Sequence, residues 1–281
     1  LIHIAGLCHD LGHGPFCHFF DNFILKDIGS NIEHEIRSCM LLKYIVEKYS
    51  INISEKELDI IFNMINPSDS FLKKDRSFLY KIVNNKANGI DVDKFDYIKR
   101  DSFFLGMSFG LDCSRIIKQA RVIDDEICFL DKTFYDIQEL YEVRDKLHRR
   151  VYKHHTNHAI DFMIYRFFKD LMKNINFKDY VEHPEKFYIL DDNLIWRFQH
   201  NILDRIRERK FYKHIEDVEL DKCKDKINKI INNDKVIITE LNFGYDKEIF
   251  KNIFFYKDNK KFTKNFNICE KEKIIRIIDY S

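Results

Sequence analysis

The chain has 281 residues, with 47 Lys and Arg against 46 Asp and Glu, and a formal net charge of +1 at pH 7. This length suffices for one large domain or two modest domains, each with its own core. Gly and Pro number only 8 and 3, which favours helix and excludes a collagen-like or proline-rich chain. The near-zero net charge gives no global field for DNA or membranes, so any anion site must be local.

The cysteines indicate a reducing environment. Seven are scattered through the chain without a C-x-x-C motif, which argues against a disulfide framework or a thiolate zinc site. No apolar run approaches the roughly 18 residues of a membrane helix, and no signal peptide is recognisable. We therefore expect an intracellular protein, in the nucleus or cytoplasm, without a membrane partner. Because Leu1 lies inside the apolar run LIHIAGL, we also expect the sequence to be a piece of a longer chain.

Apolar residues at helical spacing predict helices over 1–11, 33–49, 55–64, 76–86, 91–106, 133–175 and 192–210. The run GHGPF ends the first of these after His13. The segment 120–130 predicts a small hairpin that belongs to no larger sheet. After about residue 212 we expect strands over 235–243 and 249–256 and helices over 221–232 and 270–279. The predicted fold is mainly α, with a helical domain over 1–211 and a smaller α+β lobe over 212–281.

Histidine is concentrated at the start of the chain, where positions 3, 9, 13, 18 and 34 hold five of the 12. The segment HDLGHGPFCHFFD and the dipeptide that follows it shortly supply both imidazoles and carboxylates: His9, Asp10, His13, His18, Asp21, His34 and Glu35. These groups ligate Zn, Fe, Mn or Mg and also transfer protons near neutral pH. A lone His-Asp pair is more often a hydrogen-bonded core pair. Such a cluster at a helix end broken by Gly and Pro favours a metal or catalytic site.

The segment NGIDVDKFDYIKRD, residues 88–101, predicts a helix with a functional stripe. Asp93, Tyr97 and Asp101 are spaced by four residues and share one face, with Lys94 adjacent. This face offers a metal-ligating carboxylate, an aromatic ring and a second carboxylate. Taken alone, the segment fits a solvated helix face at least as well.

The segment VRDKLHRRVYKHH, residues 143–155, repeats the spacing with cationic side chains. Arg144, His148 and Tyr152 share one face. Arginine offers fixed donors to phosphate oxygens, and histidine can add another, which suits a polyphosphate beside a metal. A basic solvated face or a nucleic-acid patch is the equally favoured alternative for this segment alone.

Three runs in this order resemble the HD-domain deoxynucleoside triphosphate (dNTP) triphosphohydrolases: IAGLCHDLGHGPFCHFFD, FLYKIVNNKANGIDVDKFDYIKRD and LHRRVYKH. The resemblance is closest to members that also have a sterile-alpha-motif domain. No segment of this sequence matches that domain. It continues more loosely through LDDNLIWRF and NFGYDKEIF. It implies an all-helical HD core, a divalent metal (Fe, Zn, Mn or Mg), and hydrolysis of dNTPs, dGTP among them, to deoxynucleoside and inorganic triphosphate.

The resemblance also implies roles residue by residue. The metal ligands correspond to His9, Asp10 and Asp93, while the family's first ligand lies tens of residues before the HD pair and has no match here. The catalytic cluster corresponds to His13, His18, Asp21, His34 and Glu35. The substrate contacts correspond to Lys94, Tyr97, Asp101, Arg144, His148 and Tyr152.

These roles form a consistent reaction. A divalent metal lowers the pKa of bound water from 15.7 towards about 7, which gives a nucleophile at neutral pH. Attack at the α-phosphorus makes the sugar 5′ oxygen the leaving group, which needs an acid, and we expect His18 to be that acid. Arg144, Lys94 and His148 would hold the triphosphate. Tyr97 would pack where a 2′ hydroxyl would otherwise fit.

The resemblance implies regulation as well, by assembly into a homo-oligomer, a dimer or a tetramer, with a GTP or dGTP activator. Arg115, Lys132 and His154 match the family's regulatory contacts, whereas Leu130 and His155 stand where the family has arginine and lysine. A charge-assisted hydrogen bond contributes roughly 1.5–3 kcal/mol. We therefore expect weaker nucleotide-driven assembly than in the relatives, or assembly without nucleotide through the apolar strands of the final lobe.

Two alternatives stay open. One is an HD phosphohydrolase of other specificity, a nucleotidase or a nuclease. The other is a non-catalytic nucleotide-sensing or RNA-binding module, although a net charge near zero disfavours general nucleic-acid binding.

Overall fold

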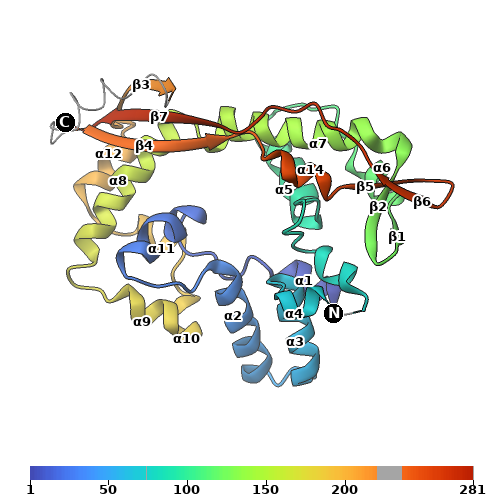
Figure 1. The fold of residues 1–281 in the computed structure, drawn as a ribbon. Coiled ribbons are helices and arrows are strands. Elements are labelled where there is room, and N and C mark those ends of the chain that lie inside the picture. Colours follow the sequence, from blue (N-terminus) through green and yellow to red (C-terminus); the bar gives the residue numbers. More distant parts are fainter. Residues whose placement is uncertain (74, 220–235, 281) are drawn as a thin grey trace. The chain divides into compact units, whose positions relative to one another are not determined.

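The structure is a computed structural model that describes residues 1–73, 75–219 and 236–280 (Figure 1). The chain divides into two compact units. The first comprises Leu1–Lys99, Val122–Ile127 and Phe167–His200, and the second comprises Arg100–Arg121, Cys128–Arg166 and Asn201–Ser281. The predicted domain division after residue 211 stays a prediction. The predicted helix over 221–232 lies outside the described residues.

Three helices build the core of the first unit: α1 (Ile2–Cys8), α2 (His34–Lys48) and α3 (Glu55–Ile65). α2 and α3 match the predicted ranges to within one residue, whereas α1 ends at Cys8 and not after His13. Ser54 and Glu57 form a reciprocal capping box that begins α3. Ala5 of α1 is fully buried in one cluster with apolar side chains of α2 and α3. The segment that carries the first histidines is therefore anchored on the core.

Short helices complete this unit: the π-helix η1 (Phe20–Leu25), α4 (Asp69–Leu72), the 3₁₀ helix η2 (Ser77–Lys81), α9 (Phe177–Glu182), α10 (Pro184–Phe187) and α11 (Asp192–Trp196). The helix predicted over 76–86 is thus only a 3₁₀ turn, because the residues after it form a polar loop with its own hydrogen bonds. The helix predicted over 192–210 is also interrupted, after Trp196.

Two longer helices contribute residues to both units, α5 (Val92–Phe104) and α8 (His155–Leu171). The second unit adds α6 (Cys113–Lys118), the 3₁₀ helix η3 (Asp131–Thr133), α7 (Phe134–Leu147), the π-helix η4 (His148–Tyr152), α12 (Asn201–Arg207) and α14 (Lys247–Lys251). The single helix predicted over 133–175 is therefore divided. After α7 the helix continues as the π-helix η4, and the chain then turns at Lys153 before α8 begins.

The strands of the first sheet are β1 (Arg121–Ile123), β2 (Glu126–Leu130), β5 (Phe254–Lys257) and β6 (Lys260–Thr263), in the order β1-β2-β5-β6. The predicted hairpin is confirmed, and Asp124 and Asp125 at its turn have left-handed φ angles of 50° and 60°. The expectation that it belongs to no larger sheet is wrong. Phe129 of β2 pairs in parallel with Phe255 of β5, a partner far away in sequence.

The second sheet has the order β3-β7-β4, with β3 (Lys213–Glu219), β7 (Glu272–Asp279) and β4 (Val236–Phe243) antiparallel to their neighbours (Figure 1). The strand predicted over 235–243 is confirmed, and that over 249–256 is a strand only in its last residues, which begin β5. The helix predicted over 270–279 is wrong, because β7 is hydrogen-bonded on both sides.

The mainly α fold with a small α+β part is confirmed. Among the described helices, none is both long enough and apolar enough to cross a membrane.

Candidate metal and catalytic site

Three predicted metal ligands come together in the first unit. His9 follows α1 directly, Asp10 is its neighbour, and Asp93 lies in the first turn of α5. His9 Nε2 lies 3.2 Å from Asp10 Oδ2 and 3.3 Å from Asp93 Oδ1. One ligand atom of each residue lies within 4.8 Å of the other two. An imidazole nitrogen and two carboxylates at this spacing suit a divalent cation.

The surroundings of His9 fit such a cation. His9 Nδ1 lies 2.8 Å from the carbonyl oxygen of Gly6, so Nδ1 carries the proton and Nε2 keeps its lone pair. Nε2 is buried beside the carboxylates of Asp10 and Asp93, at 3.2 and 3.3 Å. A carbonyl that fixes the far ring nitrogen is typical of metal-bound histidine. His9, Asp10 and Asp93 can therefore hold the group that the resemblance implies.

The same carboxylates favour a proton on His9. The hydrogen-bonding interaction with Asp93 raises the pKa of His9 to about 9, although burial opposes it, and the charge of Asp10 adds to the rise. A protonated imidazole cannot ligate a metal. A cation and a proton therefore compete for Nε2.

Metal affinity is expected to increase with pH up to the His9 pKa of about 9. Below that value the apparent Kd for Mn²⁺ should fall about tenfold per pH unit, because the deprotonated fraction rises tenfold. Calorimetry in two buffers of different ionisation enthalpy measures both the affinity and the protons released, which should be about one per cation at pH 7. A pH-independent Kd without proton release would contradict this competition.

A buried polar loop holds the start of α5. The carboxylate of Asp91 accepts hydrogen bonds from the backbone nitrogens of Asn85 and Lys94, each at 3.0 Å. Gly89 has a φ of +68°, and Lys94 Nζ donates to its carbonyl oxygen. These contacts fix the first turn of α5, and with it Asp93. Tyr97 follows one turn later on the same helix and is half-buried.

His13, His18 and His34 form a second group in this unit, again with one ligand atom of each within 4.8 Å of the others. The rings of His13 and His34 stack at 4.1 Å with 13° between their planes, and His18 lies edge-on to both at 5.0 and 5.6 Å. His13 Nε2 is 3.5 Å from Asp10 Oδ1, which links the two groups. These imidazoles can transfer protons near neutral pH, and their nitrogens also lie close enough together to hold a cation.

Asp21 orients His34. Its Oδ2 accepts hydrogen bonds from His34 Nδ1 at 2.7 Å and from the His34 backbone nitrogen at 3.3 Å, and Glu35 Oε2 lies 3.4 Å from the same Nδ1. Burial alone would lower the pKa of His34, but Asp21 and Glu35 outweigh it and raise the pKa. Burial would raise the pKa of Asp21, but His34 and Arg37 outweigh it and lower the pKa. The pair therefore favours an imidazolium beside a carboxylate.

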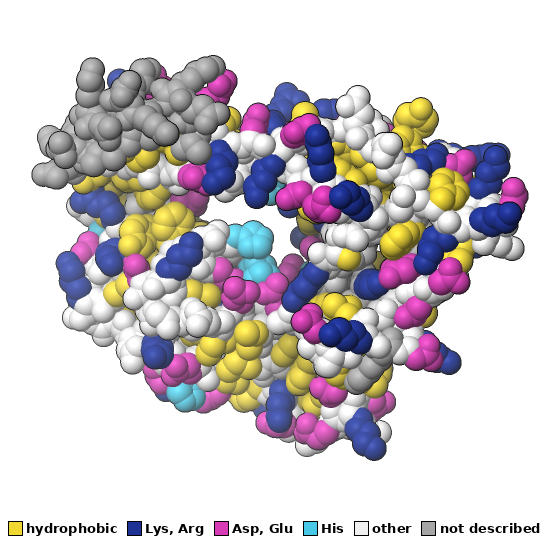
Figure 2. All heavy atoms as spheres, in the orientation of Figure 1, with side chains coloured by type: hydrophobic (Ala, Val, Ile, Leu, Met, Phe, Trp, Pro, Cys, Tyr) yellow, Lys and Arg dark blue, Asp and Glu magenta, His cyan; other side chains and the backbone are white. Residues whose placement is uncertain are grey.

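His18 lies at the exposed edge of this group. Desolvation, followed by the charges of His13 and His34, lowers the pKa of His18 below its ordinary value. A neighbouring phosphate would reverse this effect, because negative charge favours the imidazolium. Figure 2 shows histidine side chains at the surface beside acidic ones.

The turn before His18 is strained. Phe16 and Cys17 have left-handed φ angles of 61° and 53°, which cost non-glycine residues free energy. The Phe16 backbone nitrogen donates to Asp192 Oδ1 at 2.7 Å, and its ring packs edge-on against Trp196. α11 thus holds the turn in the conformation that presents His18.

The second unit brings three predicted substrate residues together. Tyr152 donates a hydrogen bond of 2.6 Å to Asp101 Oδ2, and its ring lies edge-on to that of His148 at 5.0 Å. Arg144, one turn before His148, lies over the ring of Tyr245 and is 3.4 Å from its hydroxyl. Tyr245 donates in turn to the carbonyl oxygen of Tyr141. His148 and Tyr152 thus lie together on η4, a π-helix, while Arg144 contacts Tyr245, and the cationic stripe predicted from spacing stays a prediction.

The predicted regulatory residues fall in two places within the second unit. Arg115 is 2.7 Å from Asp136 and also donates to the carbonyl oxygen of Lys132. The rings of His154 and His155 lie 4.1 Å apart with 34° between their planes. Arg115 thus has a carboxylate partner, which an activator phosphate would have to replace.

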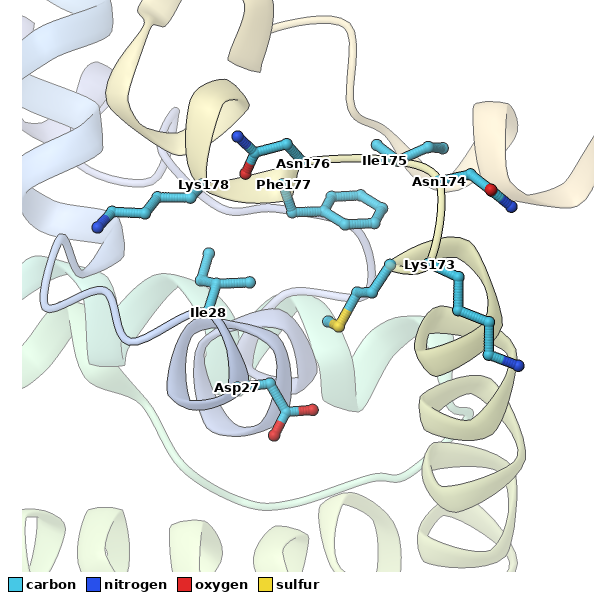
Figure 3. A pocket seen from close by; sticks show the side chains of 9 residues that line it. Asp27, Ile28, Lys173, Asn174, Ile175, Asn176, Phe177 and Lys178 are labelled. Carbon is cyan, nitrogen blue, oxygen red and sulfur yellow. The ribbon is translucent and has the colours of Figure 1, made fainter.

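A cavity of about 540 Å³ in the first unit contains none of the predicted site residues (Figure 3). Asp27, Ile28 and Phe177 contribute to its lining. Its two lysines pair with carboxylates, Lys173 with Asp170 and Lys178 with Glu182. The cavity therefore offers no converging charge for a ligand.

Comparison with known proteins shows which proteins the chain resembles. The profile of the family described as "HD associated region" matches residues 111–243. The deoxynucleoside triphosphate triphosphohydrolase SAMHD1 homologue of Dictyostelium discoideum is 34% identical over 96% of this chain and 57% of its own length. The putative HD domain-containing protein L394 of Acanthamoeba polyphaga mimivirus is 38% identical over 75% of this chain and 46% of its own. Human deoxynucleoside triphosphate triphosphohydrolase SAMHD1 is 39% identical over 58% of this chain and 30% of its own.

The chain is homologous to the HD-domain dNTP triphosphohydrolases. It spans about half the length of the first two of these relatives. The resemblance found in the sequence motifs is thereby confirmed. The roles of individual residues stay predictions, although the His9, Asp10 and Asp93 side chains meet as a set of ligands for this enzyme class would.

The sequence did not predict two residues that support the HD turn, Ser38 and Arg37. Ser38 accepts a hydrogen bond from the Gly12 backbone nitrogen and donates one to the His9 carbonyl oxygen, at 2.8 and 2.6 Å. Arg37 is buried beside it. The signal was present in the sequence, because helical spacing places Arg37 on the same face as the buried Leu41. A charged residue on an apolar face needs a partner.

Proposed function

We propose that this chain forms the HD core of a metal-dependent dNTP triphosphohydrolase, which converts dNTPs, dGTP among them, into deoxynucleoside and inorganic triphosphate. The observation that carries the proposal is the group of His9, Asp10 and Asp93 linked through His13 to the imidazole cluster. The names of the relatives from Dictyostelium and human describe the same activity.

A divalent cation bound by His9, Asp10 and Asp93 would act as a Lewis acid towards phosphate and would lower the pKa of water. The chain's own residues supply the rest. Water adds to the α-phosphorus, the bond to the 5′ oxygen breaks, and His18 donates the proton that this oxygen needs. His34, hydrogen-bonded to Asp21, carries a proton near His18 that can restore the acid form of His18.

The substrate contacts belong to the same proposal. Lys94, Arg144 and His148 would bind the triphosphate, and Tyr97, Asp101 and Tyr152 would bind the sugar and phosphates. The paired Tyr152 and Asp101 support this role, because a hydrogen-bonded pair presents a rigid polar surface.

Assembly is the last part of the proposal, as a dimer or a tetramer with a GTP or dGTP activator. Arg115 would exchange Asp136 for an activator phosphate, with Lys132 and His154 as further contacts.

Inorganic triphosphate is the expected first product when the complete protein hydrolyses dGTP. The proposed acid serves the 5′ ester oxygen, so neither pyrophosphate nor single phosphates should precede triphosphate. Ion-exchange chromatography of early time points measures the products, with Asp93→Ala as the blank. Early dGMP or dGDP would instead indicate a nucleotidase, and equal rates on GTP and dGTP would contradict the role of Tyr97. RNA bound by filter assay without any triphosphate release would favour the non-catalytic alternative.

A further inference from the structure

A buried guanidinium lies behind the imidazole cluster. Arg37, on α2, is only 1% exposed. Its Nε donates a 2.7 Å hydrogen bond to the carbonyl oxygen of Gly12, Nη1 donates to that of Ile32, and Nη2 donates to Asp21 Oδ1. One side chain therefore ties together the turn after the HD pair, the segment before α2, and η1.

The faces of two aromatic rings complete this environment. Arg37 lies 5.6 Å from the ring centre of Phe20 and 5.0 Å from that of Phe187. Such rings favour a guanidinium over an ammonium, because the planar group stacks while its edge still donates hydrogen bonds. The pocket is therefore built for arginine.

The carboxylate of Asp21 binds Arg37 with one oxygen and His34 with the other. Asp21 gives Oδ1 to Arg37 and Oδ2 to Nδ1 of His34. Because each oxygen of Asp21 is hydrogen-bonded to a different residue, Arg37 on one side and His34 on the other, the plane of the carboxylate is fixed. The direction of the His34 ring, and of the His13 ring stacked on it, follows from this plane.

Close packing makes the arrangement rigid. A Cβ on Gly12 would lie 2.1 Å from the His34 carbonyl oxygen and 2.8 Å from Arg37 Cβ, so the turn after the HD pair rests directly on the first turn of α2. Arg37 thus shares one contact surface with both the HD turn and His34.

We infer that Arg37 is a positioning residue for the reaction: through Asp21 it fixes the His34 ring relative to the HD turn. This inference rests on the proposed function and adds a residue to it. A lysine in its place keeps the charge, but one ammonium cannot reach the three acceptors in their fixed directions.

The test is a double-mutant cycle in the complete protein, with R37K, D21N and the double variant. R37K should lower kcat for dGTP about 10- to 100-fold, as substitutions behind a catalytic or metal ligand do, with KM little changed. In the D21N background R37K should cause no further loss, because the link is already broken. Wild-type kcat in R37K, or an equal loss in both backgrounds, would overturn the inference.

A matched control comes from the second unit. Arg276 is 5% exposed and donates to both oxygens of Asp217, at 2.8 and 2.6 Å. R276K should disturb a comparable buried pair while leaving kcat near the wild-type value. An equal loss of kcat in R276K would show that R37K acts through general destabilisation, against the inference. Should R37K fail to fold by circular dichroism, R37Q, which keeps an amide donor, takes its place in the cycle.

A readout without turnover separates this inference from the proposed function. In the wild-type protein the His34 Nδ1 proton, bound to Asp21, should give a low-field proton NMR signal, assigned by its loss in D21N. R37K should weaken or remove that signal. Persistence of the signal unchanged would contradict the inference even in an active enzyme. Absence of dGTP hydrolysis in the wild type, with the signal lost in R37K, would overturn only the proposed function.

Discussion

Asp93→Ala is expected to abolish both metal binding and dNTP hydrolysis in the complete protein. The substitution removes one carboxylate of the three-residue group, so only two adjacent residues, His9 and Asp10, remain as ligands. Substitution of a residue that hydrogen-bonds to a metal ligand typically costs about 10- to 100-fold in affinity or activity. Loss of a ligand itself should therefore cost more than about 100-fold. Elemental analysis after dialysis and a triphosphate-release assay measure the two effects.

Two further variants sharpen this experiment. Asp93→Asn keeps the shape of the side chain but removes its charge, so it should also lose the metal. It should lower the pKa of His9 from about 9, because Asp93 is the largest cause of the rise. Asp96→Ala changes an exposed aspartate on the same helix and should retain metal and activity. Full metal content and activity in Asp93→Ala would show that the ligand assignment is wrong.

His18→Ala should lower kcat about 10²- to 10⁴-fold, the usual contribution of a positioned acid, while the metal content stays normal. His18 is the exposed member of the imidazole group and lies next to His34, whose pKa is raised. An acid must be protonated to act, so wild-type kcat should fall as pH rises above the pKa of His18 in the substrate complex. Single-turnover assays across pH 5.5 to 9 would measure this limb, and His18→Ala should lack it.

His18→Gln is the matched variant, because it can still hydrogen-bond but cannot donate a catalytic proton. It should lose as much kcat as His18→Ala. A dNTP analogue with a bridging sulfur in place of the 5′ oxygen should recover much of the loss, since the thiolate leaves without an acid. Normal kcat in His18→Gln would assign the proton to another group of the cluster.

Several features of the site follow from the sequence because they depend on local spacing. Apolar periodicity predicts α2, α3 and the helix that carries Asp93, and a local capping box sets the start of α3. The turn that carries His13 follows from the Gly and Pro residues of GHGPF, although α1 itself already ends at Cys8. Crowded imidazoles and carboxylates in one short segment indicated metal or proton chemistry before any contact was known.

Other features depend on partners far away in the chain. The residues of β7 have apolar spacing that fits a helix equally well, and only pairing with β3 and β4 makes them a strand. β2 likewise enters a sheet because β5 lies beside it. Local propensity differences are small compared with the hydrogen bonds and burial that a neighbouring strand supplies.

The sequence by itself determined which residue types this protein brings to its reaction and on which helix faces they lie. Only the tertiary structure decided that Asp93 meets His9, that Asp21 divides its oxygens between Arg37 and His34, and that Arg37 is buried. The reason is physical: a ligand set or a buried ion pair is favourable only when distant segments hold its members within a few ångströms of each other, away from water. That distance is a property of packing and has no local signature.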